Sequence, residues 1–238
     1  SYELFLERSY SYRKLFDPSF NLLRPKNSNG TWLSPFNPDT GANFVKNPGY
    51  IEGNAWQYTF MVPHDIKGLI DLMGGEKPFV RQLDKVFDNN QFDMANEPDI
   101  AYPYLYNFVA GAAWKTQKRV RTLLDTYYHN TPDGLPGNDD TGTMSAWAVF
   151  SMLGIYPVTP GLPLYALTTP SFEEIEIQLD QSYYSNKKLL IRSNSPEKHV
   201  FIDSILLDGS PLEDFFISHK DLINSKELIF VLKSKHLK

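Results

Sequence analysis

The chain has 238 residues, enough for one large domain or two small ones with a buried core. Its 42% hydrophobic and 14% aromatic content and its mean hydropathy of -0.37 indicate a globular protein and exclude a disordered one. The net charge is -5 and there is no long run of Lys and Arg, which argues against a nucleic-acid partner. No apolar stretch reaches 18 residues, which argues against a membrane span in this segment. The chain has no cysteine, which excludes disulfides and Cys-based zinc sites.

The first informative segment is Glu52–Tyr58, which reads Glu-Gly-Asn-Ala-Trp-Gln-Tyr and precedes a predicted helix. Aromatic rings around Glu52 would remove water from its carboxyl group and favour the protonated form that a general acid needs. The simpler interpretation is a loop glutamate that caps the helix. Trp56 offers a flat apolar face on which a sugar ring can lie, although most tryptophans belong to the core.

Two amphipathic helices are predicted between residues 65 and 90. The first follows Asp65, a favoured capping residue, and stops at Gly74 and Gly75, while the second begins near Pro78. Their apolar faces consist of Ile66, Leu69, Ile70 and Met73 in the first helix, and Phe79, Leu83, Val86 and Phe87 in the second. His64, at the start of the first helix, either faces a substrate or hydrogen-bonds to a neighbouring residue.

A short polar segment follows, in which Asn96, Glu97 and Asp99 place three oxygen-bearing side chains within four residues. Such groups suit a hard cation such as calcium. The segment lacks the spacing of a calcium-binding EF-hand loop, and Asp99 could equally cap the helix that comes next. The residues alone leave both interpretations open.

Two further helices are predicted, one from about Trp114 to Tyr128 and one from about Thr143 to Leu153, where Gly154 ends it. Period 3.6 decides which side chains each helix should bury. These are Val120, Leu123, Leu124 and Tyr127 in the first helix, and Met144, Trp147, Ala148 and Ser151 in the second.

The loop Pro132–Gly142 connects these helices with more Gly and Pro residues than a simple connection requires. Asp139 and Asp140 stand just before the second helix. The free N–H groups and the dipole at a helix start favour an ionised carboxylate, which suits a general base that activates water. Helix capping is the alternative, and we expect at least one of the two residues to do only that.

The pattern changes after Gly161. Residues 173–179 alternate charged and apolar side chains with a period of two, which predicts a half-buried strand, and similar runs follow at residues 188–192, 200–207 and 227–232. We therefore predict an α+β multidomain fragment, with helices in residues 1–163 and an antiparallel β region in residues 164–238. Each part has few elements, and the chain begins without an initiator Met, so we expect it to be part of a longer protein.

The polar segments 52–58, 96–99 and 132–142 lie within otherwise apolar, aromatic sequence. Two separated carboxylates can divide the roles of general acid and general base, and aromatic rings can bind a pyranose. The pattern is typical of an active site that cleaves sugars.

These motifs and their order resemble the exo-acting α-mannosidases of glycoside hydrolase family 92. Nearly the whole chain takes part in the resemblance. The matching stretches are Tyr50–Tyr58, Val62–Ile70 with Gly74 and Gly75, Asn96–Pro98, Tyr104–Asn107, Trp114–Gln117, Pro132–Trp147, Asp203–Gly209 and Ile217–Leu222.

The resemblance implies hydrolysis of terminal α-linked mannose from glycans by an inverting, calcium-dependent acid/base mechanism. It also implies a fold in which residues 1–163 are the C-terminal half of an (α/α)6 toroid and residues 164–238 supply β-sandwich strands. A missing N-terminal β-sandwich of the same protein would complete the catalytic unit. The resemblance further implies a secreted or periplasmic protein.

The resemblance also implies roles for particular residues. Glu52 would be the general acid and Asp140 the general base, with Asp139 assisting. An inverting reaction needs room for a water molecule, so the carboxyl groups of Glu52 and Asp140 should lie about 6.5 to 9.5 Å apart. The implied substrate contacts are Trp56, Gln57 and His64. Asn96 and Glu97 are implied as calcium ligands or as neighbours of the ligands.

Two positions depart from the family pattern. Asn138 stands where some members have an acidic residue, and Asp99 with Ile100 stands where many α-1,2-acting members have Ser-His, so the expected α-1,2 specificity stays open. Two alternatives remain: a non-catalytic carbohydrate-binding fragment, and another (α/α)6 glycoside hydrolase or phosphorylase. A phosphorylase would need cationic residues in the loop of Asp139 and Asp140, and that loop has none.

Overall fold

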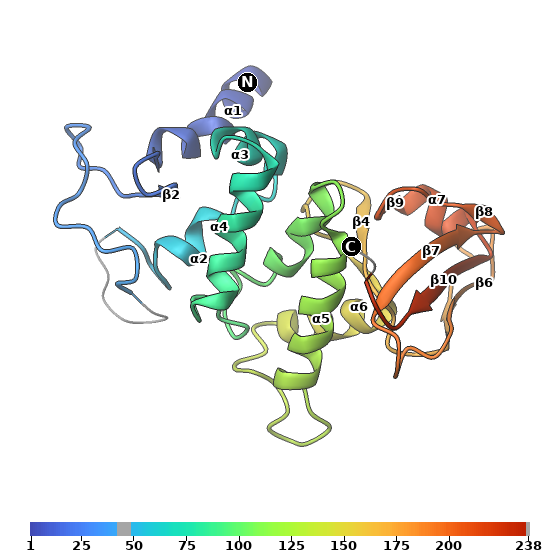
Figure 1. The fold of residues 1–238 in the computed structure, drawn as a ribbon. Helices are drawn as coiled ribbons and strands as arrows, with labels where there is room; N and C mark the ends of the chain where they lie inside the picture. Colours follow the sequence, from blue (N-terminus) through green and yellow to red (C-terminus); the bar gives the residue numbers. More distant parts are fainter. Residues whose placement is uncertain (42–48, 237–238) are drawn as a thin grey trace. The chain divides into compact units, whose positions relative to one another are not determined.

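The structure is a computed structural model that describes residues 1–41 and 49–236 (Figure 1). The chain forms two compact units, unit 1 (Ser1–Tyr102) and unit 2 (Pro103–Lys238). Their boundary lies before the change from helices to strands predicted near residue 163, because the later helices pack with the strands of unit 2. Among the described residues, no helix has both the length and the apolar composition needed to cross a membrane.

Unit 1 is mostly helical. Asp65 caps α3 by accepting the N–H of Gly68, as predicted. The next helix begins at Glu76, and Pro78 lies in its first turn, where an N–H has no intrahelical acceptor. The elements of unit 1 are α1 (Tyr2–Ser9), the 3-10 helix η1 (Tyr10–Leu15), β1 (Phe16–Asp17), β2 (Leu22–Leu23), α2 (Ala55–Thr59), α3 (Ile66–Leu72) and α4 (Glu76–Asp88).

The predicted apolar faces of α3 and α4 form much of the core of unit 1. Leu69, Phe79, Leu83 and Val86 have no exposed surface. Phe87 is half-buried and stacks on Phe92, with the two ring centroids 4.8 Å apart. The helical period in the sequence therefore located this core correctly.

Unit 2 combines helices and strands. It contains helices and strands in the order η2 (Tyr102–Phe108, which starts at the unit boundary), α5 (Ala113–Tyr127), α6 (Thr143–Leu153), β3 (Ile155–Tyr156), β4 (Leu164–Leu167), β5 (Glu174–Gln178), β6 (Lys188–Ser193), β7 (Phe201–Leu207), β8 (Ser210–Pro211), β9 (Phe216–Ser218), α7 (His219–Asn224) and β10 (Glu227–Lys233).

The described strands of unit 2 form two sheets, with strand orders β5-β6-β10-β7-β8 and β3-β4-β9 (Figure 1). Alternate residues of the longer strands enter one core, including Ile191, Leu228 and Phe230, which have no exposed surface. Side chains on the other face form cross-strand ion pairs, such as Arg192 with Glu174. The period of two thus separates an apolar face from a charged one.

Two expectations for unit 2 were wrong. The β region is not wholly antiparallel, because β6 and β10 pair in parallel. Alternation shows which face of a strand is buried but not the direction of its neighbour. Tyr127 is 39% exposed rather than buried, because it is the last residue of α5, and the extended Tyr128 stacks on Trp147 in its place.

Candidate active site

The loop that carries Glu52 ends in a helix start held by reciprocal hydrogen bonds. The Asn54 side chain accepts from the N–H groups of Trp56 and Gln57, at 2.9 and 3.2 Å. In return, Oε1 of Gln57 accepts the N–H of Asn54 at 3.1 Å. This capping box fixes the first turn of α2 and therefore the end of the Glu52 loop.

Glu52 is half-buried, and side chains bind both of its main-chain groups. Its N–H donates to the Tyr58 hydroxyl at 3.3 Å, and its carbonyl accepts from Nδ2 of Asn96 at 2.8 Å. The Tyr58 ring lies 5.7 Å from that of Tyr50. Asn54, not Glu52, is the helix cap, so the capping interpretation of Glu52 is wrong.

Trp56 and Gln57 are buried and form hydrogen bonds within unit 1. Trp56 is 9% exposed, and its indole Nε1 donates to Oδ1 of Asp39 at 2.7 Å. Gln57 is 6% exposed, and its carbonyl accepts from the buried hydroxyl of Tyr102. Contacts of either residue with a sugar stay predictions.

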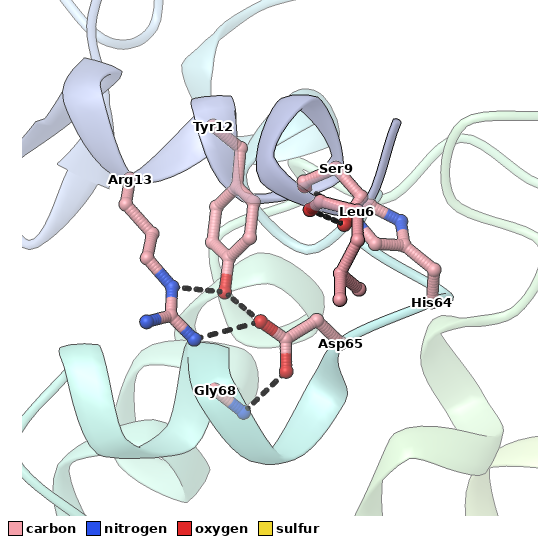
Figure 2. Close-up of polar contacts among 7 residues, drawn as sticks. All are labelled: Leu6, Ser9, Tyr12, Arg13, His64, Asp65 and Gly68. Carbon is pink, nitrogen blue, oxygen red and sulfur yellow. Dashed lines mark hydrogen bonds and ion pairs between the residues drawn. The ribbon is translucent and has the colours of Figure 1, made fainter. Parts of the chain in front are cut away.

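His64 and Asp65 bind the segment α1–η1 to the start of α3 (Figure 2). The exposed His64 hydrogen-bonds through Nε2 to the Ser9 carbonyl at 2.8 Å. Oδ2 of Asp65 accepts from the Tyr12 hydroxyl and from the Arg13 guanidinium, each at 2.8 Å, while Oδ1 accepts the N–H of Gly68. The structure therefore gives His64 a structural partner, and its contact with substrate stays a prediction.

The close approach around Asp65 explains a glycine inside α3. A Cβ on Gly68 would lie 2.3 Å from Oδ2 of Asp65 and 2.4 Å from Nη2 of Arg13. Burial acts to raise the pKa of Asp65, but the hydrogen bonds from Tyr12, Arg13 and Gly68 outweigh it and hold this pKa below its ordinary value. The carboxylate is thus ionised and structural.

The segment 93–99 lies against the Glu52 loop. Asn96 is 2% exposed, and Glu97 is half-buried. Asp99 has no exposed surface: its Oδ2 accepts the N–H of Asp93 at 2.7 Å, and its Oδ1 has no hydrogen-bond partner among the described residues. Burial raises the pKa of the Asp99 carboxyl well above its ordinary value. The side chain of Asp99 does not cap the helix that follows, because it turns back to Asp93.

The implied calcium can be tested against these donors. Asn96 and Glu97 supply hard oxygen atoms, which is the right chemistry, but calcium takes six to eight oxygen ligands. Within residues 1–41 and 49–236, no group of three or more Asp, Glu, His or Cys side chains could hold a metal ion. These residues fit a part of a calcium site, and the remaining oxygens would come from carbonyls, water, substrate or other parts of a longer protein.

A polar pocket of about 310 Å³ lies beside the capping box in unit 1. Carboxylates and amides dominate its lining, and such groups can bind hydroxyls. The lining residues are Asp39, Gly41, Asn54, Gln57, Asn90, Gln91, Phe92 and Asp93.

The loop before α6, in unit 2, gives the two aspartates different hydrogen-bond surroundings. Asp139 accepts from the N–H and the hydroxyl of Ser145, each at 2.8 Å. The Ser145 N–H, followed by the Ser145 hydroxyl, lowers the pKa of Asp139. Asp139 therefore binds an N–H of the first turn of α6, as the capping interpretation expected, but the N-cap position itself is occupied by Gly142 and by neither aspartate.

Asp140 is exposed, and its main chain is unusual. Asp140, Thr141 and Gly142 have φ values of +42°, +62° and +88° in succession. Only the Asp140 carbonyl is used locally, accepting from the Thr143 hydroxyl at 2.7 Å, and the described residues provide no hydrogen-bond partner for its carboxylate. A strained turn thus presents a free carboxylate, as a general base requires.

The candidate residues fall into two groups. Unit 1 brings Glu52, Trp56, Gln57 and Asn96 together around one loop, whereas Asp139 and Asp140 belong to unit 2. The expected separation of the two catalytic carboxyl groups stays a prediction.

Two residues of this site, Asn54 and Tyr58, were missed in the sequence. The spacing of Asn54 and Gln57, three residues apart before a helix, is a capping-box signal and could have been found. Tyr58 could not, because its hydroxyl bonds to Glu52 only after the chain has turned.

Comparison with known proteins extends over the whole chain. Residues 1–234 match the glycosyl hydrolase family 92 catalytic domain. A protein of Arthroderma benhamiae described as an uncharacterized secreted glycosidase is 30% identical over an alignment of 249 positions, which covers 97% of this chain and 32% of that protein.

Solved structures agree. A family GH92 α-mannosidase of Bacteroides thetaiotaomicron in complex with mannoimidazole gives a TM-score of 0.86 at 32% identity, covering 98% of this chain and 33% of that chain. A family GH92 inverting mannosidase of the same organism gives a TM-score of 0.86 at 28% identity, with 98% and 34% covered.

The chain therefore spans about a third of the length of these relatives. The match includes all three polar segments and both groups of candidate residues. On this extent of sequence and structural similarity, the chain belongs to glycosyl hydrolase family 92.

Proposed function

We propose that this chain is part of an exo-α-mannosidase that removes terminal α-linked mannose from glycans with inversion. The observation that carries the proposal is that a family 92 chain holds two candidate residues, Glu52 and Asp140, in differently built loops. Glu52 has its main chain held by Tyr58 and Asn96, and Asp140 presents an unbonded carboxylate from a strained turn. The similar structures described as an α-mannosidase and an inverting mannosidase support the substrate class and the stereochemistry.

Each residue has a defined step. The protonated Glu52 gives its proton to the glycosidic oxygen as the bond from that oxygen to C1 breaks. Asp140 takes a proton from a water molecule that attacks C1 from the opposite face, so α-linked substrate yields β-mannose. Asp139, bonded to Ser145, holds the start of α6 and thereby the direction of the turn that carries Asp140.

Calcium belongs to the same proposal. Asn96 and Glu97 would contribute oxygens to it, and the bound ion would supply electrostatic stabilisation for the hydroxyls of the reacting sugar. Trp56, Gln57 and His64 are proposed as substrate contacts, directly or through the loops that they fix. We further propose an enzyme of α-1,2 type, exported from the cell.

The architecture of the complete enzyme is likewise a proposal. The helices of residues 1–163 would form half of an (α/α)6 toroid, and an N-terminal β-sandwich would complete the site. The one-third coverage of each relative supports only the part of this proposal that requires further chain. The chain alone is therefore expected to be inactive.

Mannose release by the full-length parent tests the proposal, with an α-1,2-linked mannobiose as substrate and with or without a calcium chelator. Glu52→Gln and Asp140→Asn should each lower kcat on the order of 100-fold or more, because each removes a proton-transfer group. Chelation should abolish turnover, and added calcium should restore it. An active Asp140→Asn enzyme, or turnover that is indifferent to chelation, would contradict the mechanism; sugar binding without turnover would identify a binding protein.

A further inference from the structure

The amide of Asn96 lies against the main chain of the proposed general acid. Its Nδ2 donates to the Glu52 carbonyl at 2.8 Å, and the residue is 2% exposed. A carbonyl oxygen can only accept, so the amide nitrogen must face Glu52 and the amide oxygen must point elsewhere. The amide nitrogen of Asn96 is therefore the end that serves Glu52, and its oxygen does not take part in this contact.

The segment that presents Asn96 is itself held by carboxylates. The buried Asp99 accepts the N–H of Asp93 at 2.7 Å, and Oδ1 of Asp93 accepts the N–H of Ala95 at 2.9 Å. The N–H of Asn96 also donates to the Asp93 carbonyl, at 3.3 Å. These bonds close the segment on itself and limit the directions in which the Asn96 side chain can point.

Glu52 depends on such contacts because it precedes α2 rather than lying within it. Tyr58 binds its N–H, but at 3.3 Å, and this partner lies in α2, only six residues further along the chain. Asn96 supplies the shorter bond, from a segment 44 residues away in the sequence. It thus ties the main chain of Glu52 itself to a distant segment of unit 1, whereas the neighbouring tie from Asn54 to Gln91 acts on the helix cap.

We propose that Asn96 is a positioning residue for the general acid, whose amide N–H holds the Glu52 carbonyl and thereby sets the direction of the Glu52 carboxyl group. The inference rests on the proposed function, since it requires Glu52 to be the acid. It is distinct from calcium binding, because only the amide oxygen of Asn96 can contact a cation.

The dependence on the leaving group separates this role from others. A mannosyl leaving group needs a proton from the acid as the bond breaks, whereas a 2,4-dinitrophenolate leaves without one. A misdirected acid therefore slows cleavage of mannobiose and spares cleavage of the dinitrophenyl α-mannoside. A general loss of structure, or a loss of calcium, slows both reactions alike.

The decisive variant is Asn96→Asp in the full-length parent. It keeps the size and a metal-binding oxygen of the side chain but replaces the donor with an acceptor. Because a small displacement of a reacting group costs up to about 100-fold, kcat on mannobiose should fall on the order of 10- to 100-fold with KM changed less than about threefold. On the dinitrophenyl mannoside, kcat should fall less than about threefold. Calcium affinity, measured by titration calorimetry, should be unchanged or tighter, since a carboxylate is the stronger ligand.

Asn186→Asp is the matched control. The Asn186 amide also donates to main-chain carbonyls, those of Ile223 and Ser225, but it lies in the β region. This variant should keep the kcat of the wild type on both substrates. An equal loss in Asn186→Asp would overturn the proposal, and so would a normal kcat in Asn96→Asp, an equal loss of kcat on both substrates, or a defect that saturating calcium repairs.

Two further variants keep every outcome informative. If Asn96→Asp does not fold, Asn96→Ala removes the donor without adding charge and should show the same selective loss on mannobiose; a uniform loss would contradict the proposal. Glu52→Gln provides the reference for leaving-group selectivity. If the wild-type parent does not cleave mannosides, or if Glu52→Gln slows both substrates equally, the proposed function has failed. If Glu52→Gln slows mannobiose selectively but the Asn96 variant slows both substrates equally, only the present inference is refuted.

Discussion

Asp65 shows how one carboxylate can join two segments of a fold. It caps α3 through Gly68 and binds both Tyr12 and Arg13 from η1 (Figure 2). Arg13 is half-exposed, but the Asp65 side chain is only 17% exposed, so its charge depends on these donors. These hydrogen bonds lower the pKa of Asp65. The stability of the contact between Asp65 and η1 therefore depends on pH.

We expect Asp65→Asn to destabilise the parent protein by about 1 kcal/mol at pH 7, because Asn retains a cap acceptor but loses the charge that binds Arg13. The pKa of Asp65 is lower in the folded state than in the unfolded state, where it is about 3.9. The charge of Asp65 therefore stabilises the folded state at pH values above about 3.9, and this stabilisation is lost as the pH falls through the pKa of the folded state. The difference between wild type and variant should therefore shrink below about pH 4, as measured by urea denaturation at several pH values.

The exposed pair of Asp203 and Lys233 is the control for this effect. Asp203→Asn should change stability by less than about 0.5 kcal/mol, because exposed ion pairs contribute little. An Asp65→Asn variant that behaves like Asp203→Asn would show that the contacts in Figure 2 do not stabilise the protein.

The aspartates also show which residue roles can be predicted from the sequence. Asp65 was correctly predicted as a cap because its acceptor role is local, three residues from Gly68. Asp99 was not assigned, since its partner Asp93 lies upstream and its burial comes from tertiary packing. The contact of Asn96 with Glu52 joins distant segments, and a single sequence does not contain that information.

At the scale of elements, the turn before α6 is strained. Asp140, Thr141 and Gly142 all have left-handed φ values, and a β-branched residue such as Thr141 is the least suited to them. The turn leads directly into the cap between Asp139 and Ser145. Strain that persists at a proposed base is typical of a site where the backbone direction matters.

Thr141→Gly should therefore stabilise the parent by about 0.5 to 1 kcal/mol, because relief of left-handed strain exceeds the added chain entropy of glycine. The same change should lower kcat several-fold, since the turn that aims Asp140 becomes less rigid. Thermal unfolding and mannose release on one preparation measure both. A variant that loses both stability and activity would show that Thr141 contributes a contact, not strain.

The elements themselves were largely predictable. Helices α3, α5 and α6 and strands β5, β6, β7 and β10 lie within one or two residues of their expected bounds, because each has a clear period of apolar residues. The parallel pairing of β6 with β10 was missed, since strand direction depends on the path of the chain between them. Short strands such as β3 are too brief to show a period.

At the scale of the whole molecule, α1 bears on how this chain relates to a longer parent. None of its residues is buried, although Tyr2 and Phe5 are large and apolar, 72% and 64% exposed. A helix with an apolar face normally buries it against another element. Since the relatives are about three times as long as this chain, we expect other parts of the parent to cover α1.

Phe5→Ser separates a covered helix from an exposed one. In the full-length parent, the loss of a buried aromatic side chain should cost about 3 kcal/mol or more and lower the melting temperature by several degrees, whereas in this chain alone the change should be close to zero. Tyr183→Ser is the control, because Tyr183 is 82% exposed in the β region and should be neutral in both proteins. Equal tolerance of Phe5→Ser in both would mean that α1 stays exposed in the parent, and its apolar side chains would then have to be explained by a separate partner.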